Sequence, residues 1–245
     1  MRERGDVSAR ALLDEFAERG IVRLTGVFSE DEARAMRNAV SEGVRVKRHP
    51  AFRRIVGEPL RQFATALLGE GWKVSKGLGN VLVSDQDCER WFLPGQEALW
   101  HSDFPYTFPM DPLPALRVFA VFGSVPPGGG GTLLVAGSHR MVARFAKEFP
   151  EAAAKPAKRA RAACHGSNDW LHDLTGASGT DPGRTERFIE RTTDVDGIPA
   201  QVIEACGDPG DVFVCHPWTI HCRPPNAAPQ SRFLRSPTLS RRPAS

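Results

Sequence analysis

Residues 98–109 read "ALWHSDFPYTFP", which places a histidine and an aspartate two positions apart among apolar residues. Successive side chains of a β-strand point to opposite faces of the sheet, so residues i and i+2 share a face. On a predicted strand over 97–103, His101 and Asp103 therefore project side by side into one space. They are either a hydrogen-bonded polar pair in a core or two metal ligands, and the second hypothesis needs a third ligand.

Residues 207–237, "GDPGDVFVCHPWTIHCRPPNAAPQSRFLRSP", offer two candidates for that ligand. His216 ends a predicted strand and is followed by a proline, whereas His221 lies in the next predicted strand, and both remain candidates at this point. Arg232 stands further along, in a third strand, and its planar guanidinium matches a carboxylate with two parallel hydrogen bonds. Two histidines, a carboxylate and an arginine form a chemically coherent set.

The pattern around these motifs predicts a mainly β protein. From residue 72 onward, short alternating runs are separated by Gly, Pro and Asp, without the alternation of strands and helices that builds a parallel sheet. This texture favours a double-sheet jelly roll. The predicted strands span 72–76, 79–84, 97–103, 115–123, 131–136, 201–205, 211–215, 219–223 and 231–239.

Helices are predicted before the strands, packed on the outside of the jelly roll. The first spans 8–20 with Ser8 as N-cap, the second 30–42 with the capping-box pair Ser29 and Glu32, and the third 59–69. We expect one domain over residues 1–245, with an irregular insertion at about 141–195 whose first part is helical. That insertion either lies over the site or is a plain surface loop.

Four blocks in order resemble the phytanoyl-CoA dioxygenase family of non-haem iron and 2-oxoglutarate-dependent oxygenases. They are the opening "FAERGIVRLTGVFSEDEARAMRNAV", the "WHSD" strand, "GGGGTLLVAGSHR", and "GDVFVCHPWTIHCRPPNAAPQSR". The resemblance implies a double-stranded β-helix, that is, a cupin-like jelly roll. It also implies that His101, Asp103 and His221 bind Fe(II) and that Arg232 binds the far carboxylate of 2-oxoglutarate.

The implied activity is oxidation of a small organic molecule, with hydroxylation favoured, coupled to decarboxylation of 2-oxoglutarate to succinate and CO2. Two imidazoles and one carboxylate leave three coordination positions open, two for the keto acid and one for O2. Desaturation, epimerisation and cyclisation use the same site. Related halogenases lack the acidic ligand, so Asp103 argues against halogenation. Relatives of this kind act on acyl thioesters, amino acids and polycyclic natural products, and the sequence does not choose among them.

Three alternatives compete with this interpretation. A zinc site would use Cys215, His216, His221 and Cys222, but adjacent strand residues face opposite sides and would not converge easily. Arg235 and Arg223 compete with Arg232, and a different strand register would exchange Arg235 for it. A jelly-roll module that binds or senses a metal without turnover is the other class of function.

Other residues are candidates for the pocket around 2-oxoglutarate. Thr132 follows four glycines at a position that the family often places near the keto acid, and Gln96, Asn80 and Lys76 precede or flank the "WHSD" block. Some family members have a hydroxyl residue two positions after the distal histidine, where Arg223 stands here. Ser138 and His139 are expected to make local hydrogen bonds, with a role of His139 in substrate binding as the alternative.

Aromatic and basic side chains near the motifs have two interpretations each. The stretch "FPYTFPM", 104–110, either lines the mouth of the site or caps the end of the barrel, and Trp100 and Trp218 are expected in the core. The basic cluster of the insertion is expected to lie mostly on one solvated side of a helix; it comprises Lys155, Lys158, Arg159 and Arg161.

Composition limits the classes of partner. The chain has 245 residues, 41% of them hydrophobic, and a formal net charge of +3, far from that of a dedicated nucleic-acid binder. Five cysteines without a CxxC pair favour free thiols and a cytoplasmic protein. No stretch resembles a signal peptide or a membrane span, so we expect a small-molecule substrate and neither nucleic acid nor membrane as partner.

Overall fold

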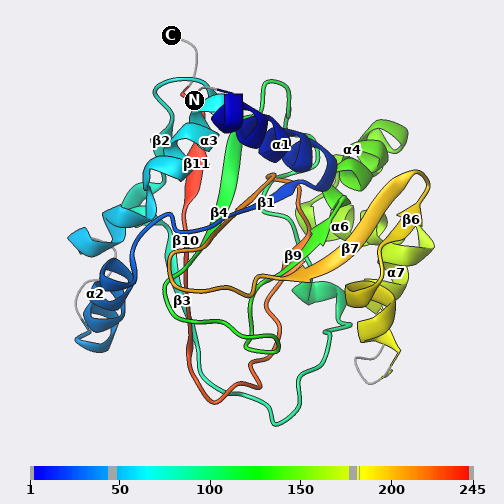
Figure 1. Ribbon diagram of the computed structural model, residues 1–245. Coiled ribbons are helices and arrows are strands. Elements are labelled where there is room, and N and C mark those ends of the chain that lie inside the picture. The colour runs from blue at the N-terminus through cyan, green and yellow to red at the C-terminus, as the bar shows by residue number, and fades with distance from the viewer. Residues whose placement is uncertain (1–2, 44–48, 177–180, 182, 243–245) are drawn as a thin grey trace.

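The computed structural model describes residues 3–43, 49–176, 181 and 183–242 (Figure 1). The first part is helical apart from one strand: α1 (Glu3–Arg19), β1 (Ile21–Leu24), α2 (Glu30–Ser41), the 3-10 turn η2 (Pro50–Ile55) and α3 (Glu58–Leu68). Ser29 and Glu32 form the predicted capping box of α2, because each side chain accepts from the other's backbone N–H. Helix α1 begins at Glu3, so Ser8 lies inside it and is not its N-cap.

Two antiparallel sheets follow. In the described part of the chain the larger sheet has seven strands, with β1, β8 (Val212–Cys215), β4 (Ala115–Val121), β10 (Arg232–Ser236) and β3 (Asn80–Ser84) adjacent in that order. At its other margin β11 (Thr238–Ser240) pairs with both β4 and β2 (Lys73–Val74). The smaller sheet has the order β6 (Thr193–Val195), β7 (Ile198–Glu204), β5 (Leu133–Ala136) and β9 (His221–Cys222).

Apolar side chains form three layers. The middle layer lies between the sheets and joins Phe119, Val121 and Leu234 of the large sheet to Leu134 and Ala136 of the small one. A second layer packs the helices α1–α3 against the outer face of the large sheet. The predicted jelly roll with N-terminal helices on its outside is confirmed.

The third apolar layer is formed largely by the insertion. The first part, which was predicted to be helical, forms α4 (Ser138–Glu148), α5 (Pro150–Ala153) and α6 (Ala157–His165). The second part, which was predicted to be irregular, contains α7 (Asp169–Gly176) and the π-helical turn η5 (Glu186–Glu190). Their apolar side chains pack with Trp100, Leu133 and Val202 against the outer face of the small sheet. Figure 1 shows α4, α6 and α7 gathered beside β7 and β6, away from α2 and α3. Residues 177–180 and 182 of the insertion lie outside the described part.

Some strand predictions need correction. The predicted strand 97–103 is instead the 3-10 turn η4 (Glu97–Leu99) followed by a single β-bridge at His101. The predicted strand 72–76 shortens to β2, because the 3-10 turn η3 (Lys76–Leu78) begins there, with Gly77 at a φ of 66°. The run 231–239 divides into β10 and β11 at Pro237, which has no N–H to donate to a sheet.

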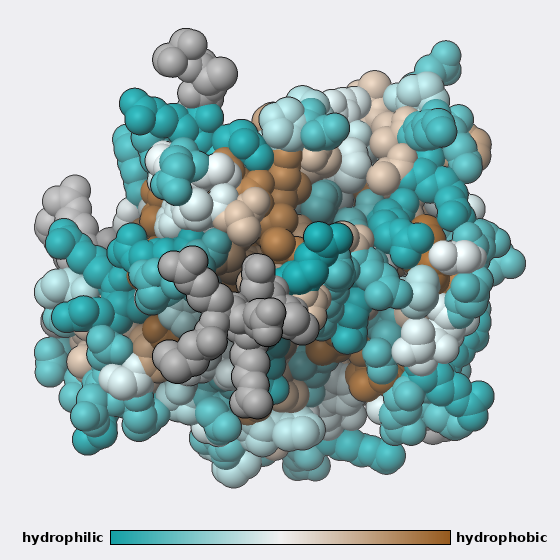
Figure 2. All heavy atoms as spheres, turned by 45° about the horizontal axis from the view of Figure 1, so that its top comes forward, coloured by the Kyte–Doolittle hydropathy of each residue, from teal (hydrophilic) through white to brown (hydrophobic). Residues whose placement is uncertain are grey.

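The face shown in Figure 2 is mostly hydrophilic, with a smaller apolar area near its middle, whereas the apolar side chains gather in the layers inside. Among the described residues, no helix is both long and apolar enough to cross a membrane.

Candidate active site

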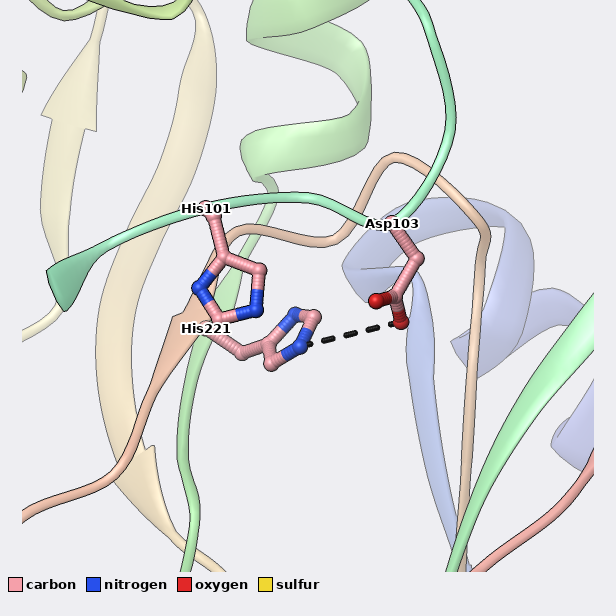
Figure 3. A group of neighbouring side chains, drawn as sticks. All are labelled: His101, Asp103 and His221. Atoms are coloured by element: carbon pink, nitrogen blue, oxygen red, sulfur yellow. Dashed lines mark ion pairs between the residues drawn. The ribbon is translucent and has the colours of Figure 1, made fainter. Parts of the chain in front are cut away.

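His101, Asp103 and His221 come together at one point (Figure 3). One potential ligand atom from each lies within 4.8 Å of those of the other two. Within the described ranges this is the one group of three or more His, Cys, Asp or Glu side chains close enough to share an ion. His221 is 6% exposed, whereas the Asp103 side chain is 26% exposed. The cluster therefore has a buried side and a side open to solvent.

The two histidines are joined through their backbones. His101 N–H donates to the carbonyl of His221 at 3.0 Å, and His221 N–H donates back at 2.8 Å. Reciprocal bonds of this kind hold two residues of antiparallel segments directly opposite each other. Next to them, the Ser138 hydroxyl accepts from Ile220 N–H at 2.9 Å and donates to Val135 O at 2.7 Å. The backbone before His221 is therefore tied to the start of α4.

The hydrogen bonds of both imidazoles leave the same nitrogen free. Nδ1 of His101 lies 3.0 Å from Leu99 O, and Nδ1 of His221 lies 3.0 Å from Thr219 O. A carbonyl oxygen only accepts, so each Nδ1 carries the proton and each neutral ring keeps a lone pair on Nε2. Metal-binding histidines in proteins are commonly oriented by a bond of this type on the other nitrogen.

Burial keeps His221 in the form that binds metals. It lowers the pKa of His221 to about 4, against a smaller opposing effect of the Asp103 carboxylate. At neutral pH the ring is therefore uncharged. The Phe119 ring stands edge-on to it at 5.5 Å between centroids and closes the site on the side of β4.

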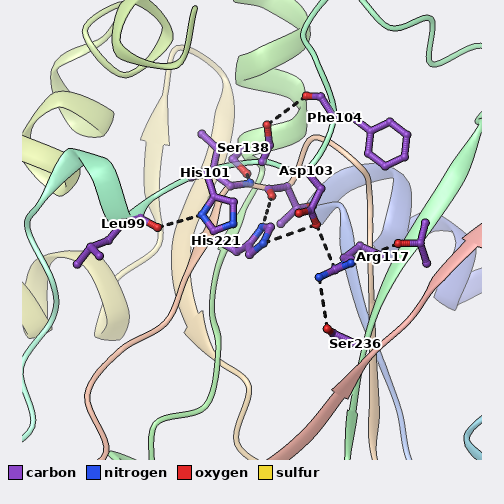
Figure 4. A network of polar contacts seen from close by, with 12 residues as sticks. Leu99, His101, Asp103, Phe104, Arg117, Ser138, His221 and Ser236 are labelled. Carbon is purple, nitrogen blue, oxygen red and sulfur yellow. Dashed lines mark hydrogen bonds and ion pairs between the residues drawn. The ribbon is translucent and has the colours of Figure 1, made fainter. Parts of the chain in front are cut away.

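Asp103 is held differently from the histidines. It lies in a bend, outside any strand, and its carboxylate faces Arg117 of β4 (Figure 4). Arg117 Nε is 3.1 Å from Asp103 Oδ2, while its terminal nitrogens donate to the hydroxyls of Thr238 at 3.2 Å and Ser236 at 3.4 Å. The guanidinium also lies 5.4 Å from the centroid of the Phe119 ring. A side chain fixed from several sides thus orients the aspartate.

Arg232 is the first residue of β10, where it lies opposite Ser84 of β3, and its side chain is buried. It is 3% exposed and donates from NH1 to Gly130 O at 2.6 Å, while its Nε is buried without a hydrogen-bond partner. Leu134, which pairs with His221, comes four residues after Gly130. Four extended residues span at most about 14 Å, so this is the largest distance along the chain between the residue that Arg232 binds and the partner of His221. Burial lowers the pKa of Arg232 to about 10, so it stays charged at neutral pH. A buried cation with an unused donor fits an anionic ligand group.

The two rival arginines are placed elsewhere. Arg235, three residues after Arg232, faces the opposite side of β10, donates to Leu78 O at 2.8 Å and stacks on Phe52 at 4.4 Å. Arg223 is exposed on the surface and donates to Ser84 and Asp87. Arg235 is also buried and has one terminal nitrogen without a partner, but it lies with Phe52 on the outer face of the large sheet, away from the space between the sheets.

His216 and His139 form a separate pair. Their ring centroids are 4.9 Å apart, His216 Nδ1 accepts from Trp218 N–H at 3.1 Å, and His139 Nε2 donates to Ala17 O at 3.1 Å. This contact to α1 is not the local bond expected of His139, whereas Ser138 makes the local bond to Val135. The residues of the zinc alternative do not assemble into a group of ligands in the described structure.

For the remaining predicted residues, the described part of the chain shows no contact with the cluster that assigns a role. Thr132 is 4% exposed beside the glycine turn 128–131, which is held because Gly128 and Gly131 N–H donate to the Glu204 carboxylate. Asn80 is exposed and lies opposite Ser236 in the β3–β10 register. Gln96 is exposed before η4, and Lys76 is exposed in η3.

Sequence reasoning missed Arg117 and Glu204. The signal for Arg117 was a single charge in the apolar run "ALRVFAV", because a charge in a central strand needs a partner. It also missed Asn226, which is fully buried and donates to Ser84 O and Gln230 O, so that the loop before Arg232 is fixed. Trp100 and Trp218 pack in the core as expected.

A pocket of about 340 Å³ adjoins the cluster and includes Asp103 in its wall. One wall is the segment from Ser102 to Thr107, and the other is the pair of helices α5 and α6 of the insertion. Part of the aromatic stretch 104–110 therefore lines a cavity next to Asp103. A larger and more open hollow of about 940 Å³ lies by α3 and β2, and none of the three clustered residues lines it.

Comparison with solved structures identifies the fold. The chain is similar to the epimerase SnoN in complex with Fe3+, α-ketoglutarate and nogalamycin RO, with 17% identity and a TM-score of 0.56 over 96% of this chain and 84% of that one. It is similar to HygX from Streptomyces hygroscopicus with nickel and 2-oxoglutarate bound, with 15% identity and a TM-score of 0.58 over 94% and 86%. It is also similar to the α-ketoglutarate-dependent carbocyclase SnoK from nogalamycin biosynthesis, with 18% identity and a TM-score of 0.58 over 94% and 83%.

No family model matches the chain, and no curated protein matches it. At these low identities the structural likeness shows the fold alone. This fold is that of non-haem, 2-oxoglutarate-dependent enzymes.

Proposed function

We propose that this protein is an iron(II)- and 2-oxoglutarate-dependent dioxygenase that oxidises a small organic molecule. The observation that carries the proposal is the cluster of His101, Asp103 and His221, whose potential ligand atoms all lie within 4.8 Å of one another. Two histidines and one carboxylate on one face of a metal are the donor set of non-haem iron oxygenases. When bound, Fe(II) and 2-oxoglutarate supply the reaction with O2 that yields succinate, CO2 and an oxidised substrate.

The residues of the chain have distinct tasks in this proposal. The three clustered side chains hold the iron, and Arg117 orients Asp103. Arg232 binds the distal carboxylate of 2-oxoglutarate through its unused donors, and Thr132, Gln96 and Asn80 complete the walls around the keto acid. The apolar layer between the sheets excludes water from the buried side of the site.

The finer identity extends this proposal. Membership of the phytanoyl-CoA dioxygenase family is supported by the order of the motifs, and a cytoplasmic location by the five free cysteines. Natural-product biosynthesis is supported by neighbours from nogalamycin biosynthesis. Hydroxylation is the expected reaction, and epimerisation or cyclisation, named for SnoN and SnoK, would use the same residues.

An anaerobic titration with Fe(II) and 2-oxoglutarate tests the metal site. Wild type should develop the visible charge-transfer band of a keto acid chelated to iron, and His221→Ala should lose it because one of three ligands is gone. His216→Ala is the matched control, since this partly buried histidine lies in the separate pair with His139, and it should keep the band. If wild type binds iron without a band, the protein is a metal-binding module and the oxygenase proposal fails.

The same titration tests Arg232. In Arg232→Met the 2-oxoglutarate concentration at half-maximal band should rise by about 30-fold or more, because truncating one partner of a buried charge pair costs about 2–5 kcal/mol. Iron affinity in the absence of keto acid should change little. Arg223→Met should shift that concentration by less than about threefold; an equal effect of both changes would contradict the assignment.

A further inference from the structure

The pocket beside Asp103 differs from the rest of the site in its charges. Its wall contains two cations, Lys155 and Arg161, and Asp103 is the one acidic residue in it. If the proposed function holds, the Asp103 carboxylate is occupied by the metal and by Arg117. The pocket then presents an excess of positive charge to whatever enters it.

One cationic side chain in this wall has an unused donor. Arg161 Nε is buried and makes no hydrogen bond. Tyr106 is 6% exposed, and its segment is fixed because Trp218 Nε1 donates to Pro105 O at 3.0 Å. An unpaired donor on a buried cation is satisfied by an acceptor that a ligand brings into the pocket.

The start of α6 adds to the positive potential. Ala157, its first residue, lines the pocket, and Pro156 at the N-cap makes no side-chain hydrogen bond to the helix. The first turn contains no acidic residue that would neutralise the free N–H groups. Helix N-termini with free N–H groups favour anions.

Apart from its two cations and the N-terminus of α6, the pocket has a largely apolar lining. Phe104 and Pro105 form one side, and small side chains on α5 and α6 leave room on the other: Ala153, Ala154, Ala157 and Ala160. A volume of about 340 Å³ lies at the lower end of the range of ligand pockets, about 300–1,000 Å³. A ring or short chain with one charged group fits this combination.

We propose that this pocket is the substrate-binding site and that the substrate is a small apolar molecule bearing one anionic group, a carboxylate, phosphate or sulfate. Lys155, Arg161 and the N-terminus of α6 hold the anionic group, and the body of the substrate extends along Phe104 toward Asp103. The proposal rests on the proposed function, because the metal side of Asp103 is where oxidation takes place. The insertion would then select the substrate as well as cover the small sheet.

Fluorine NMR with matched probes tests this proposal. The probes are 4-fluorobenzenesulfonate, 4-fluorobenzoate and 4-fluorophenyl phosphate, with neutral 4-fluorobenzenesulfonamide as the isosteric control. Each is titrated against the full chain saturated with 2-oxoglutarate and with either diamagnetic Zn(II) or paramagnetic Mn(II). We expect the anions to bind at least tenfold more tightly than the sulfonamide, and the preferred anion identifies the group. We also expect Mn(II) to broaden the bound probe signal strongly, because the pocket adjoins the metal ligands.

Variants assign the effect to the pocket. Lys155→Met with Arg161→Met should weaken anion binding at least tenfold and leave sulfonamide binding unchanged. Lys158→Met with Arg159→Met removes the same charge from exposed positions of α6 that do not line the pocket, and it should bind anions like wild type. Ala157→Asp places an acid at the first turn, which favours the helix but repels an anion, so it gives the same answer if the double variant does not fold.

Each contrary result has a different meaning. Equal binding of sulfonate and sulfonamide, or equal loss in the two double variants, overturns the anion site. Anion binding without a Mn(II) effect, in a protein that shows the charge-transfer band with iron, overturns the substrate assignment. If the band is also missing, the proposed function itself fails, and anion binding is then a property of the pocket alone.

Discussion

The protein contains two pairs of close histidines that look alike but differ in what their ring nitrogens contact. The ring centroids of His101 and His221 are 4.4 Å apart with a tilt of 49°, and those of His139 and His216 are 4.9 Å apart with a tilt of 42°. In the first pair both Nε2 atoms keep a lone pair, and the charged neighbour that favours protonation is Asp103. In the second, the lone pair of His216 is taken by Trp218 N–H, and the charged neighbour of His139 is the cation Arg140.

The second pair is closed by packing as well. A Cβ on Gly20 would lie 2.4 Å from His139 Nδ1, so this nitrogen lies against the backbone at the end of α1. Gly20 adopts a φ of 70°, which ends α1 and allows this close approach. Proximity of two imidazoles is therefore a poor criterion for a metal site. The useful criteria are an unused nitrogen on each ring and a carboxylate within reach.

Removing the Asp103 carboxylate should leave His101 and His221, like His139 and His216, without an acidic residue to complete a metal site. In Asp103→Ala we expect the affinity for Fe(II) to fall by about 100-fold or more, since even outer partners of metal ligands contribute about 10–100-fold. Calorimetric titration with Fe(II) or Mn(II) under anaerobic conditions measures the change. Asp173→Ala, which removes a carboxylate paired with Arg187 at the surface, should leave the affinity unchanged. Near-wild-type affinity in Asp103→Ala would contradict the proposed ligand set.

Lowering the pH should reduce the free energy of unfolding through the second pair, His139 and His216. Burial lowers the pKa of His139 to about 4 and that of His216 to about 3, against an ordinary value near 6.5. The unfolded chain therefore binds more protons, and the stability that neutral rings provide above pH 6.5 is lost as the pH falls toward 4. In His139→Phe the decrease in unfolding free energy between pH 7.5 and pH 5 should be smaller by about 2 kcal/mol, measured by urea denaturation.

The control for this experiment is His172→Phe. His172 has 71% of its side chain exposed, so its replacement should not change the pH dependence. If His139→Phe follows the same pH curve as His172→Phe and wild type, the second pair is not neutral in the folded protein.

Arg117 gives the smallest of the three expected effects. Arg117→Met leaves all three ligands in place but frees the Asp103 carboxylate to rotate, so Fe(II) affinity should fall by about tenfold. Arg117→Lys should recover part of this loss, because a cation returns without the planar fork. Arg144→Met, which removes a surface pairing with Asp196, is the control. A loss as large as that of Asp103→Ala would mean that Arg117 has a further task at the site.

The sequence predicted those parts of the fold whose causes are local. The capping box of Ser29 and Glu32 and the apolar spacing after it predicted α2 to within one residue of its observed end. Gly69 ended α3 as expected, with a φ of 74°. The insertion was predicted in part: its first half was expected to be helical with breaks at Pro150 and Pro156, but α7 was missed because its apolar residues lie among polar ones.

At the site, too, residues in local motifs were predicted, whereas contacts between distant parts of the chain were not. The three clustered residues and Arg232 were found because they belong to motifs, but the strand that was expected to align His101 and Asp103 does not form. Arg117 was missed because its partner Asp103 comes from a different part of the chain, and only the tertiary structure brings β4 beside that bend. Likewise, the basic cluster of the insertion was expected on one solvated side, but Arg161 turns inward and its Nε is buried.

The reciprocal backbone bonds between His101 and His221 have a consequence for biosynthesis. The two residues are 120 positions apart (221 − 101), so a growing chain holds only two of the three clustered side chains until His221 has been made. Closing such a long loop is slow compared with forming local helices. The ligand set proposed for iron therefore assembles late in folding, after the local helices have formed.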